Sequence, residues 1–379
     1  MKQIVCLSTS PWYPIPTRKQ QVMSRLGDAE ILYFDPPVTY LAAFKDPTAR
    51  EKRTAYKKPG EKIQENLTVY SLPPVLPFLR KYRAINRLTQ KRQARFVKKI
   101  CKAHGFQNPI LWCYSPTAAD LVGRIPHAAL VYDCVDRHSA YGGLSDPAMV
   151  DAMELELAEQ ADAVFATAQS LCDRLRTVHP EAVFLPNGAN FERFYAASQP
   201  QPCPEDFPEG DGPVFGFVGA LQDCIEYSYV AFAANRHPDW RFVFLGRQLP
   251  GVDLAELKAL PNCHFLGLKP NEQLPRYIAQ FDACLNLFRD CELSRDVSPL
   301  KFYEYLATGK PVVSTPMPEQ VLQFAEVIHL AHSPEEFAAA CEAALSDSNA
   351  AARIEYGRQS SWDSRVAQME AILSQKGIL

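Results

Sequence analysis

The segment Arg295-Asp-Val-Ser-Pro-Leu-Lys-Phe-Tyr-Glu304-Tyr-Leu-Ala-Thr-Gly309-Lys-Pro-Val-Val-Ser-Thr315 predicts a short helix that is followed directly by a buried strand. Ser298 is a suitable helix N-cap, and Pro299 suits the first helical position because a backbone N–H there would find no partner in the helix. Gly309 suits the left-handed residue that ends a helix. Helices that alternate with buried strands are typical of α/β proteins with a parallel sheet.

Two charged residues of the same helix indicate an anion site. Lys301 lies in the first turn, where a cation opposes the helix dipole by about 0.3–1 kcal/mol and where free N–H groups need an acceptor. A bound diphosphate would satisfy both requirements. Glu304 shares the face of Lys301 and could hold vicinal hydroxyls, such as those of a ribose. The alternative is a solvated helix end with a surface pair worth about 0.3–0.5 kcal/mol.

Composition indicates a globular protein of two or three domains, since the chain has 379 residues, of which 47% are hydrophobic and 22% charged. The eleven cysteines are scattered and form no Cys-x-x-Cys, which is typical of reduced core residues in a cytoplasmic protein. No run of eighteen apolar residues predicts a membrane span, and the first residues enter a strand-like segment without a signal sequence. We therefore expect a cytoplasmic protein.

Positive charge is concentrated in one region, because residues 40–104 hold seventeen Lys or Arg against four acids although the whole chain has a net charge of −3. Ten of these cations lie between Arg80 and Lys102, interleaved with apolar residues. The pattern is typical of a basic amphipathic helix that contacts anionic lipid, and it predicts peripheral contact with the inner membrane face. A nucleic-acid groove would show the same charge, but no recognition motif accompanies it, so no nucleic-acid partner is expected. A helix with a solvated basic face is the third interpretation.

Apolar, β-branched runs alternate with helical periodicity through most of the chain, which predicts α/β architecture with parallel sheets. The segment 196–212 is rich in proline and has no helical period, so we predict an interdomain linker there. The expected organisation is an N-terminal Rossmann-like domain over 1–195, a C-terminal Rossmann-like domain over 213–349 and a C-terminal helical segment over 350–379. The predicted strands are 3–8, 30–34, 67–71, 109–113, 129–134, 163–166, 182–185, 214–218, 241–245, 263–266, 283–287, 311–314 and 327–330.

The chain resembles the GT-B glycosyltransferases, and within them the retaining family 4-like enzymes of teichuronic acid and exopolysaccharide biosynthesis. Residues 299–313 look like the donor-site helix and strand of that family, and the resemblance covers essentially the whole chain. The two acids of the family, separated by seven residues, fall on Asp296 and Glu304, with Asp in place of the usual first Glu. The resemblance implies two doubly wound domains that face a cleft, with a C-terminal helix that crosses back to the first domain.

The resemblance also implies roles on the donor side. Residues 132–138 look like the first-domain segment that faces the donor sugar, so Asp136 and His138 are candidates for contact with the sugar; an N-cap for Asp136 and loop surface for His138 are the alternatives. Residues 216–220 resemble the glycine turn under the diphosphate, but the basic pair that often follows this turn in relatives is missing. The expected diphosphate and nucleobase contacts are Gly219, Ala220, Arg247, Lys269, Arg295, Ser298, Pro299, Leu300 and Lys301.

The first strand-to-helix loop, residues 10–20, follows a strand end, which is where doubly wound sheets bind ligands. Trp12 and Tyr13 suit stacking on an acceptor sugar, and a structural role for both is the alternative. Arg18 and Lys19 suit the phosphates of a lipid-linked acceptor.

The implied reaction moves a hexose from a nucleotide sugar, with UDP as the expected nucleotide, to a saccharide acceptor carried on a lipid, with retention of configuration. No cofactor or metal is expected, because Asp-x-Asp does not occur and because His329 and His332 look like a strand terminus. Asp136, His138, Arg295 and Lys301 are the candidate catalytic residues. Two alternatives remain, namely a sugar-nucleotide epimerase of the same fold and a catalytically silent scaffold of a polysaccharide assembly complex.

Overall fold

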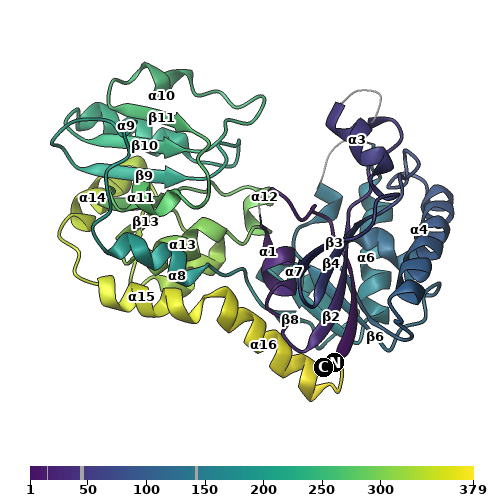
Figure 1. Cartoon of the computed structure of the whole chain (residues 1–379). Helices are drawn as coiled ribbons and strands as arrows, with labels where there is room; N and C mark the ends of the chain where they lie inside the picture. Colours follow the sequence, from purple (N-terminus) through teal and green to yellow (C-terminus); the bar gives the residue numbers. More distant parts are fainter. Residues whose placement is uncertain (15, 43–46, 141–143) are drawn as a thin grey trace. The chain divides into compact units, whose positions relative to one another are not determined.

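The computed structural model describes residues 1–14, 16–42, 47–140 and 144–379 (Figure 1). The chain forms two compact units, each with its own parallel sheet. Unit 1 comprises Met1–Pro186 and Val366–Leu379, and unit 2 comprises Asn187–Arg365.

Unit 1 is built on an eight-stranded sheet in the order β3-β4-β2-β1-β5-β6-β7-β8, in which only the β3–β4 pair is antiparallel. Every strand predicted for this half is present, and only β3 was not predicted, because its polar residues lack an apolar period. The strands are β1 (Lys2–Leu7), β2 (Ala29–Asp35), β3 (Glu61–Gln64), β4 (Leu67–Ser71), β5 (Ile110–Cys113), β6 (Ala129–Cys134), β7 (Ala163–Ala166) and β8 (Val183–Phe184).

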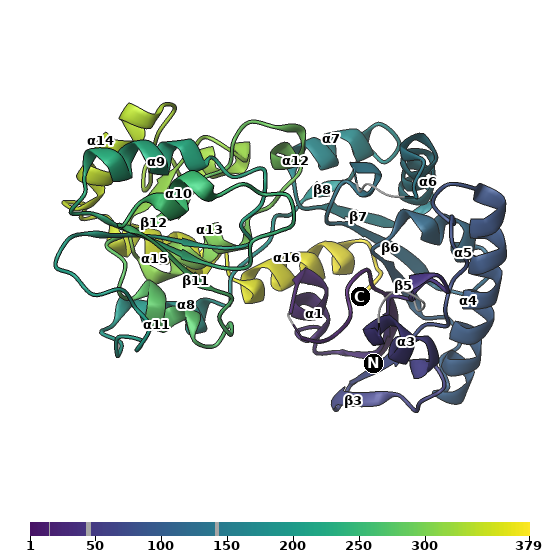
Figure 2. The ribbon, with the colours of Figure 1, turned by 90° about the horizontal axis from the view of Figure 1, so that it is seen from above.

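Helices cover both faces of this sheet, since successive strand residues point to opposite sides. Val5 and Leu7 pack with α4 to α7, whereas Ile4 and Cys6 pack with α1 and with the part of α16 that belongs to unit 1 (Figure 2). The unit is therefore doubly wound. Its helices are α1 (Arg18–Met23), α3 (Pro47–Ala55), α4 (Arg83–Ala103), η1 (Pro116–Ala118), α5 (Ala119–Val122), η2 (His138–Ala140), α6 (Pro147–Gln160) and α7 (Gln169–Arg176), with α16 (Trp362–Gln375) entering the unit at Val366.

Unit 2 is built on an all-parallel sheet in the order β11-β10-β9-β12-β13-β14, and each of its strands was predicted. The strands are β9 (Val214–Val218), β10 (Arg241–Leu245), β11 (Cys263–Gly267), β12 (Ala283–Asn286), β13 (Val312–Ser314) and β14 (His329–Leu330). The helices are α8 (Phe191–Tyr195), η3 (Ala196–Ser198), α9 (Tyr227–Arg236), α10 (Ala255–Ala259), α11 (Leu274–Ile278), α12 (Glu292–Arg295), α13 (Leu300–Thr308), η4 (Glu319–Phe324), α14 (Pro334–Ala344) and α15 (Ala350–Gln359).

The segment predicted as an interdomain linker lies inside unit 2, because the boundary between the units falls at Pro186 and not at residue 195. Hydrogen bonds hold it there: the Arg241 guanidinium donates to the carbonyl oxygens of Pro208 and Gly212 at 2.9 and 2.6 Å, and Gln280 Nε2 donates to the Gln201 carbonyl at 3.1 Å. The proline-rich segment 196–212 is thus held within unit 2 by hydrogen bonds to its backbone carbonyl oxygens. Residues 350–365, predicted to pack on the first half, also belong to unit 2.

Candidate donor and acceptor sites

Helix α13 is the predicted helix, shifted by one residue at its start. It spans Leu300–Thr308 with Pro299 at the N-cap, and Gly309 adopts the predicted left-handed conformation with φ 73°. Ser298 does not cap the helix, because its hydroxyl accepts from the Asn187 N–H at 3.0 Å and donates to Gln320 Oε1 at 3.3 Å. The N-terminus of α13 therefore has no side-chain cap. The hydrogen bonds of the Ser298 hydroxyl instead fix the backbone just before the helix.

The helix is fixed to the sheet by its buried aromatic residues. The Tyr305 hydroxyl accepts from the Val218 N–H at 2.7 Å, at the end of β9, and the Tyr303 hydroxyl donates to Gln320 Oε1 at 3.0 Å. Because α13 follows β12 through α12, its first turn lies at the carboxyl edge of the sheet, where doubly wound folds bind ligands. Within the described part of the chain, the N–H groups of Leu300 and Lys301 donate to no backbone carbonyl.

Lys301 and Glu304 form the predicted pair, but it is not a solvated one. Lys301 Nζ lies 2.6 Å from Glu304 Oε2 and 5.5 Å from the centre of the Phe194 ring. Glu304 is only 8% exposed. Burial raises the pKa of Glu304, and the charge of Lys301 opposes that shift. The site therefore holds a buried carboxylate next to an ammonium group that is 28% exposed.

The two other charged residues of the opening segment differ in their surroundings. Asp296 is 6% exposed and forms the C-cap of α12. Arg295, in contrast, has an exposed side chain whose Nε donates to Asp290 Oδ1 at 3.0 Å. The structure thus places a buried carboxylate at both acid positions, while the cation expected from Arg295 is held by Asp290.

Of the two residues predicted in the glycine turn after β9, Gly219 does not offer its amide. The Gly219 N–H donates to the Leu245 carbonyl at 2.9 Å, so it serves the sheet and not a phosphate. Ala220 is exposed. Gly246 lies against this turn with φ 152°, and a Cβ there would come within 1.7 Å of the Gly219 oxygen. The close approach of two strand ends explains the glycine at position 246.

A pocket of about 310 Å³ lies beyond the ends of β9, β10 and β11. Arg247, which was predicted, lines it with an exposed side chain, whereas Lys269 does not, because its ammonium pairs with Asp206 and lies 5.5 Å from the Tyr277 ring centre. Lys258 was missed, since no sequence signal separates it from other surface lysines. The residues that line this pocket are Leu221, Gly246, Arg247, Gln248, Lys258, Phe265, Gly267 and Leu268.

In unit 1, Arg18 forms a buried ion pair at the strand ends. Its Nε lies 2.9 Å from Asp133 Oδ2, and its Nη1 donates to the Pro186 carbonyl at 3.1 Å. Arg18 is 2% exposed and Asp133 is fully buried. Arg18 Nη2 has no hydrogen-bond partner among the described residues. Arg18 therefore has a structural role, which the sequence of the first loop did not indicate.

Lys19, Asp136 and His138 come together near this pair, as the electrostatics show. Burial lowers the pKa of Lys19, and the charges of Asp136 and Asp133 oppose that shift. Burial, with the charges of Arg80 and Lys19, lowers the pKa of His138 to about 3, so its imidazole is neutral near pH 7. His138 is 2% exposed, so the alternative of loop surface is wrong. Asp136 is half-buried.

The two aromatic residues of the first loop, Trp12 and Tyr13, have different surroundings in the structure. Trp12 is 9% exposed, its backbone N–H donates to Asp35 Oδ1 at 2.8 Å, and its ring contacts Tyr33 edge to face with centroids 4.9 Å apart. Trp12 is thus part of the core, as the structural alternative had it. Tyr13 is 56% exposed and remains the candidate for stacking on a ligand.

In the part of the chain that the structure describes, no three His, Cys, Asp or Glu side chains gather as metal ligands. His329, which the sequence placed at a strand terminus, lies in β14 and its Nε2 is 2.9 Å from Asp347 Oδ2.

The architecture is a GT-B fold, with two doubly wound α/β units. Residues 212–347, which contain α13 and the pocket beyond β9 to β11, match the family model described as "Glycosyl transferases group 1". The resemblance that the sequence indicates is confirmed for the fold.

A curated relative is TuaH of Bacillus subtilis (strain 168), whose name assigns it to teichuronic acid biosynthesis as a glycosyltransferase. The two are 29% identical over 255 residues, so the match spans 62% of this chain and 63% of the relative.

Solved structures of similar fold cover 99% of this chain and 99% of their own. They include the sucrose-phosphate synthase of Thermosynechococcus elongatus, with a TM-score of 0.69 and 16% identity. A trehalose-6-phosphate protein of E. coli, bound with UDP-2-fluoro glucose, gives 0.71 and 12%. Anabaena HepE, in complex with UDP and glucose, gives 0.64 and 13%.

Proposed function

We propose that the protein transfers a hexose from a nucleoside diphosphate sugar, with UDP as the nucleotide, to a lipid-linked saccharide in bacterial surface polysaccharide biosynthesis. The observation that carries this proposal is that the group 1 domain match includes α13, with its buried Glu304 beside Lys301. Two similar structures were solved with UDP or a UDP sugar, and the curated relative is named for a polysaccharide pathway.

Unit 2 supplies the donor-binding groups in this proposal. The pocket beyond β9 to β11 offers the apolar surface of Leu268 and Phe265 for a nucleobase. Glu304 accepts from the ribose hydroxyls, and Lys301 with the N–H groups of Leu300 and Lys301 holds the diphosphate, because an N-terminal helix turn favours anions. Arg247, exposed at the edge of the pocket, adds positive charge.

The bond from the anomeric carbon to the diphosphate oxygen breaks while the acceptor hydroxyl oxygen bonds to the same carbon. Negative charge grows on the leaving diphosphate, and fixed donors there contribute about 2.7–4 kcal/mol each by analogy with oxyanion holes. For retention, the acceptor attacks from the face that the phosphate leaves, and the leaving phosphate oxygen takes the acceptor proton. We propose that no metal ion is needed, because Lys301 and the helix amides stabilise that charge.

Unit 1 supplies the acceptor side. Lys19 at the strand ends suits the acceptor phosphate, and Asp136 and neutral His138 keep their proposed role of contact with the donor sugar. The exposed face of α4 carries Arg87, Lys91, Lys98 and other cations but no acid, so we propose that it contacts anionic lipid headgroups. No helix in the described part of the chain is long and apolar enough to cross a membrane.

A thermal-shift screen of UDP, GDP and their hexose conjugates tests donor binding, because a ligand at a hundred times its Kd adds about 2.7 kcal/mol of stability. The catalytic test is release of nucleoside diphosphate from the best donor. Release that requires a saccharide acceptor supports transfer, whereas isomerised nucleotide sugar without acceptor would assign the epimerase. Binding of no nucleotide sugar at all would favour the silent scaffold.

A further inference from the structure

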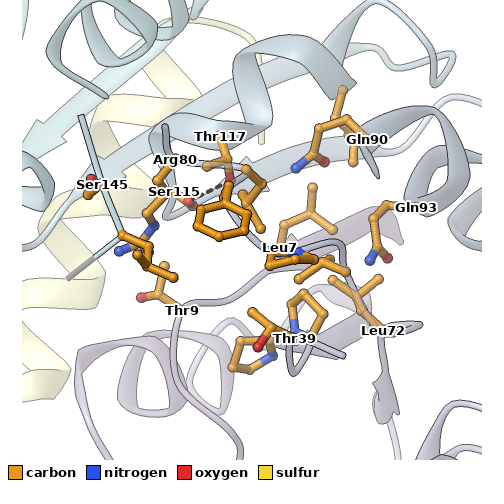
Figure 3. A pocket seen from close by; sticks show the side chains of 18 of the residues that line it. Leu7, Thr9, Thr39, Leu72, Arg80, Gln90, Gln93, Ser115, Thr117 and Ser145 are labelled. Atoms are coloured by element: carbon orange, nitrogen blue, oxygen red, sulfur yellow. Dashed lines mark hydrogen bonds between the residues drawn. The ribbon is translucent and has the colours of Figure 1, made fainter. Parts of the chain in front are cut away.

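A pocket of about 410 Å³ in unit 1 is lined by none of the residues proposed above for donor binding (Figure 3). This volume is within the range of small-molecule sites. The pocket lies beyond the carboxyl ends of β1, β2, β4 and β5, and half of the residues that line it are aliphatic or proline, among them Leu7, Pro36, Leu72 and Val75. Its position is therefore that of a ligand site in a doubly wound sheet.

One wall residue has an unusual backbone. Phe78 lines the pocket with φ 64°, and it is the one non-glycine residue in the described part of the chain with a positive φ. Bulky residues in this conformation persist only where the surrounding structure fixes them, and they cluster at ligand sites.

A cation and a hydroxyl lie together at one side of the pocket, where Figure 3 shows Arg80 and Ser145. The charge of Arg80 contributes, after burial, to the low pKa of His138, so Arg80 lies within electrostatic range of that imidazole. The Ser145 hydroxyl is shielded from water and has no hydrogen-bond partner among the described residues. An anionic group between these two side chains would pair with both.

The opposite side is formed by α4, which contributes Gln90 and Gln93. The protein already uses both amide nitrogens, since Gln93 Nε2 donates to the Pro73 carbonyl at 2.6 Å and Gln90 Nε2 donates to Asn86 Oδ1 at 3.2 Å. These side chains close the pocket at its far end.

The entrance is apolar and exposed, because Leu41 and Leu144 line it with 44% and 57% of their surface in solvent. Large apolar side chains in solvent beside a pocket mark a contact surface for an apolar ligand or a membrane. The other face of α4 is cationic, with Lys91 and Arg92 exposed. One helix thus lines an apolar pocket and presents positive charge to solvent, which suits an amphiphile drawn from an anionic bilayer.

We propose that this pocket binds the apolar chain of a lipid phosphate, with the phosphate between Arg80 and Ser145. The inference rests on the proposed function in one respect, namely that the lipid phosphate is the carrier of the sugar acceptor. A saccharide is the competing occupant, because the side-chain oxygen Oε1 of Gln93 is buried without a partner among the described residues and could accept from a sugar hydroxyl. The exposed leucines favour the lipid.

Isothermal titration of the full chain with n-decyl phosphate below its micellar concentration tests the proposal, with n-butyl phosphate and glucose 1-phosphate as comparison ligands. We expect decyl phosphate to bind about tenfold or more tightly than butyl phosphate, because each methylene removed from water adds affinity. Leu144→Gln should weaken decyl phosphate about tenfold and leave butyl phosphate unchanged, whereas Arg80→Gln should weaken both. Leu345→Gln in unit 2, at another exposed leucine, is the matched control.

Equal affinity for the decyl and butyl compounds, or an unaffected Leu144→Gln variant, would overturn the proposal. Tighter binding of glucose 1-phosphate than of decyl phosphate would assign the pocket to a saccharide. Leu144 is exposed, so its replacement should preserve the circular dichroism spectrum. If decyl phosphate binds but no nucleotide sugar releases its nucleotide, the transferase function is wrong and the lipid pocket stands. If sugar transfer occurs but decyl phosphate does not bind, the lipid pocket is wrong and the transferase function stands.

Discussion

The two units have similar sheets but place their buried ion pairs at opposite edges. In unit 1 the pair of Arg18 and Asp133 lies at the carboxyl edge, because Asp133 is the second-last residue of β6. In unit 2 Arg353 binds Asp347 at 3.0 Å and donates to the carbonyls of Gly309 and Val327, which precede β13 and β14. That pair therefore lies at the amino edge.

This difference affects what each carboxyl edge can bind. In unit 2 the buried pair of Arg353 and Asp347 is away from the ligand edge, so Arg247, the amides of α13 and the partly exposed Lys301, which pairs with Glu304, can face an anion. In unit 1 the strand ends are filled by a fixed ion pair and by neutral His138, and the open space lies to one side, in the apolar pocket. We infer that unit 2 suits a charged ligand and unit 1 an amphiphilic one.

The largest expected effect comes from breaking the pair in unit 1. Asp133→Asn should cost about 3–5 kcal/mol of unfolding free energy, because it leaves the Arg18 guanidinium buried without a counter-charge. Denaturant unfolding followed by tryptophan fluorescence measures the loss, since Trp12 and Trp112 both lie in the core of this unit.

The double variant Arg18→Met with Asp133→Leu is the control, because it removes both charges and should recover most of the loss. A cost below about 1 kcal/mol for Asp133→Asn would show that water reaches the Arg18 guanidinium. The statement that a buried ion pair fills the carboxyl edge of unit 1 would then be wrong.

The next effect concerns the open edge of unit 2. Glu304→Gln keeps the shape of the side chain but removes the charge, so donor binding and kcat/KM should fall about 10²-fold while the melting temperature stays close to that of the parent. Leu322→Gln, at an exposed residue of the same unit, should leave both kinetic parameters unchanged. Normal kinetics in Glu304→Gln would mean that the carboxylate only neutralises Lys301.

The sequence predicted what depends on local pattern and missed what depends on contacts between distant segments. The strands follow from apolar periodicity, and Gly309 follows from the left-handed end of a helix. The amide of Gly219 was assigned to a phosphate because nothing local reveals that Leu245 accepts from it. The pairing of Arg18 with Asp133, 115 residues apart, was hidden for the same reason.

The buried pair of Arg353 and Asp347 should make unit 2 sensitive to acid. Burial would raise the pKa of Asp347, but hydrogen bonds from Arg353, Asn349 and His329 hold it at about 2, below its usual 3.8. A depressed pKa contributes stability above the unfolded pKa, and this contribution of about 2 kcal/mol is lost as pH falls from about 4 to about 2. Unfolding curves of the parent and of Asp347→Asn should therefore converge over that window. A constant difference would show that the pair does not titrate.

The smallest expected effect concerns the cationic outer face of unit 1. Lys98→Gln removes one exposed charge of α4, so binding to anionic vesicles at low salt should weaken about fivefold, since each cation near such a surface contributes about 1 kcal/mol. Flotation with phosphatidylglycerol vesicles measures it, and added salt should erase the difference by screening. Arg236→Gln, an exposed cation of α9 in unit 2, is the matched control. Equal losses from the two variants would mean that the membrane senses net charge alone, and α4 would have no special role in docking.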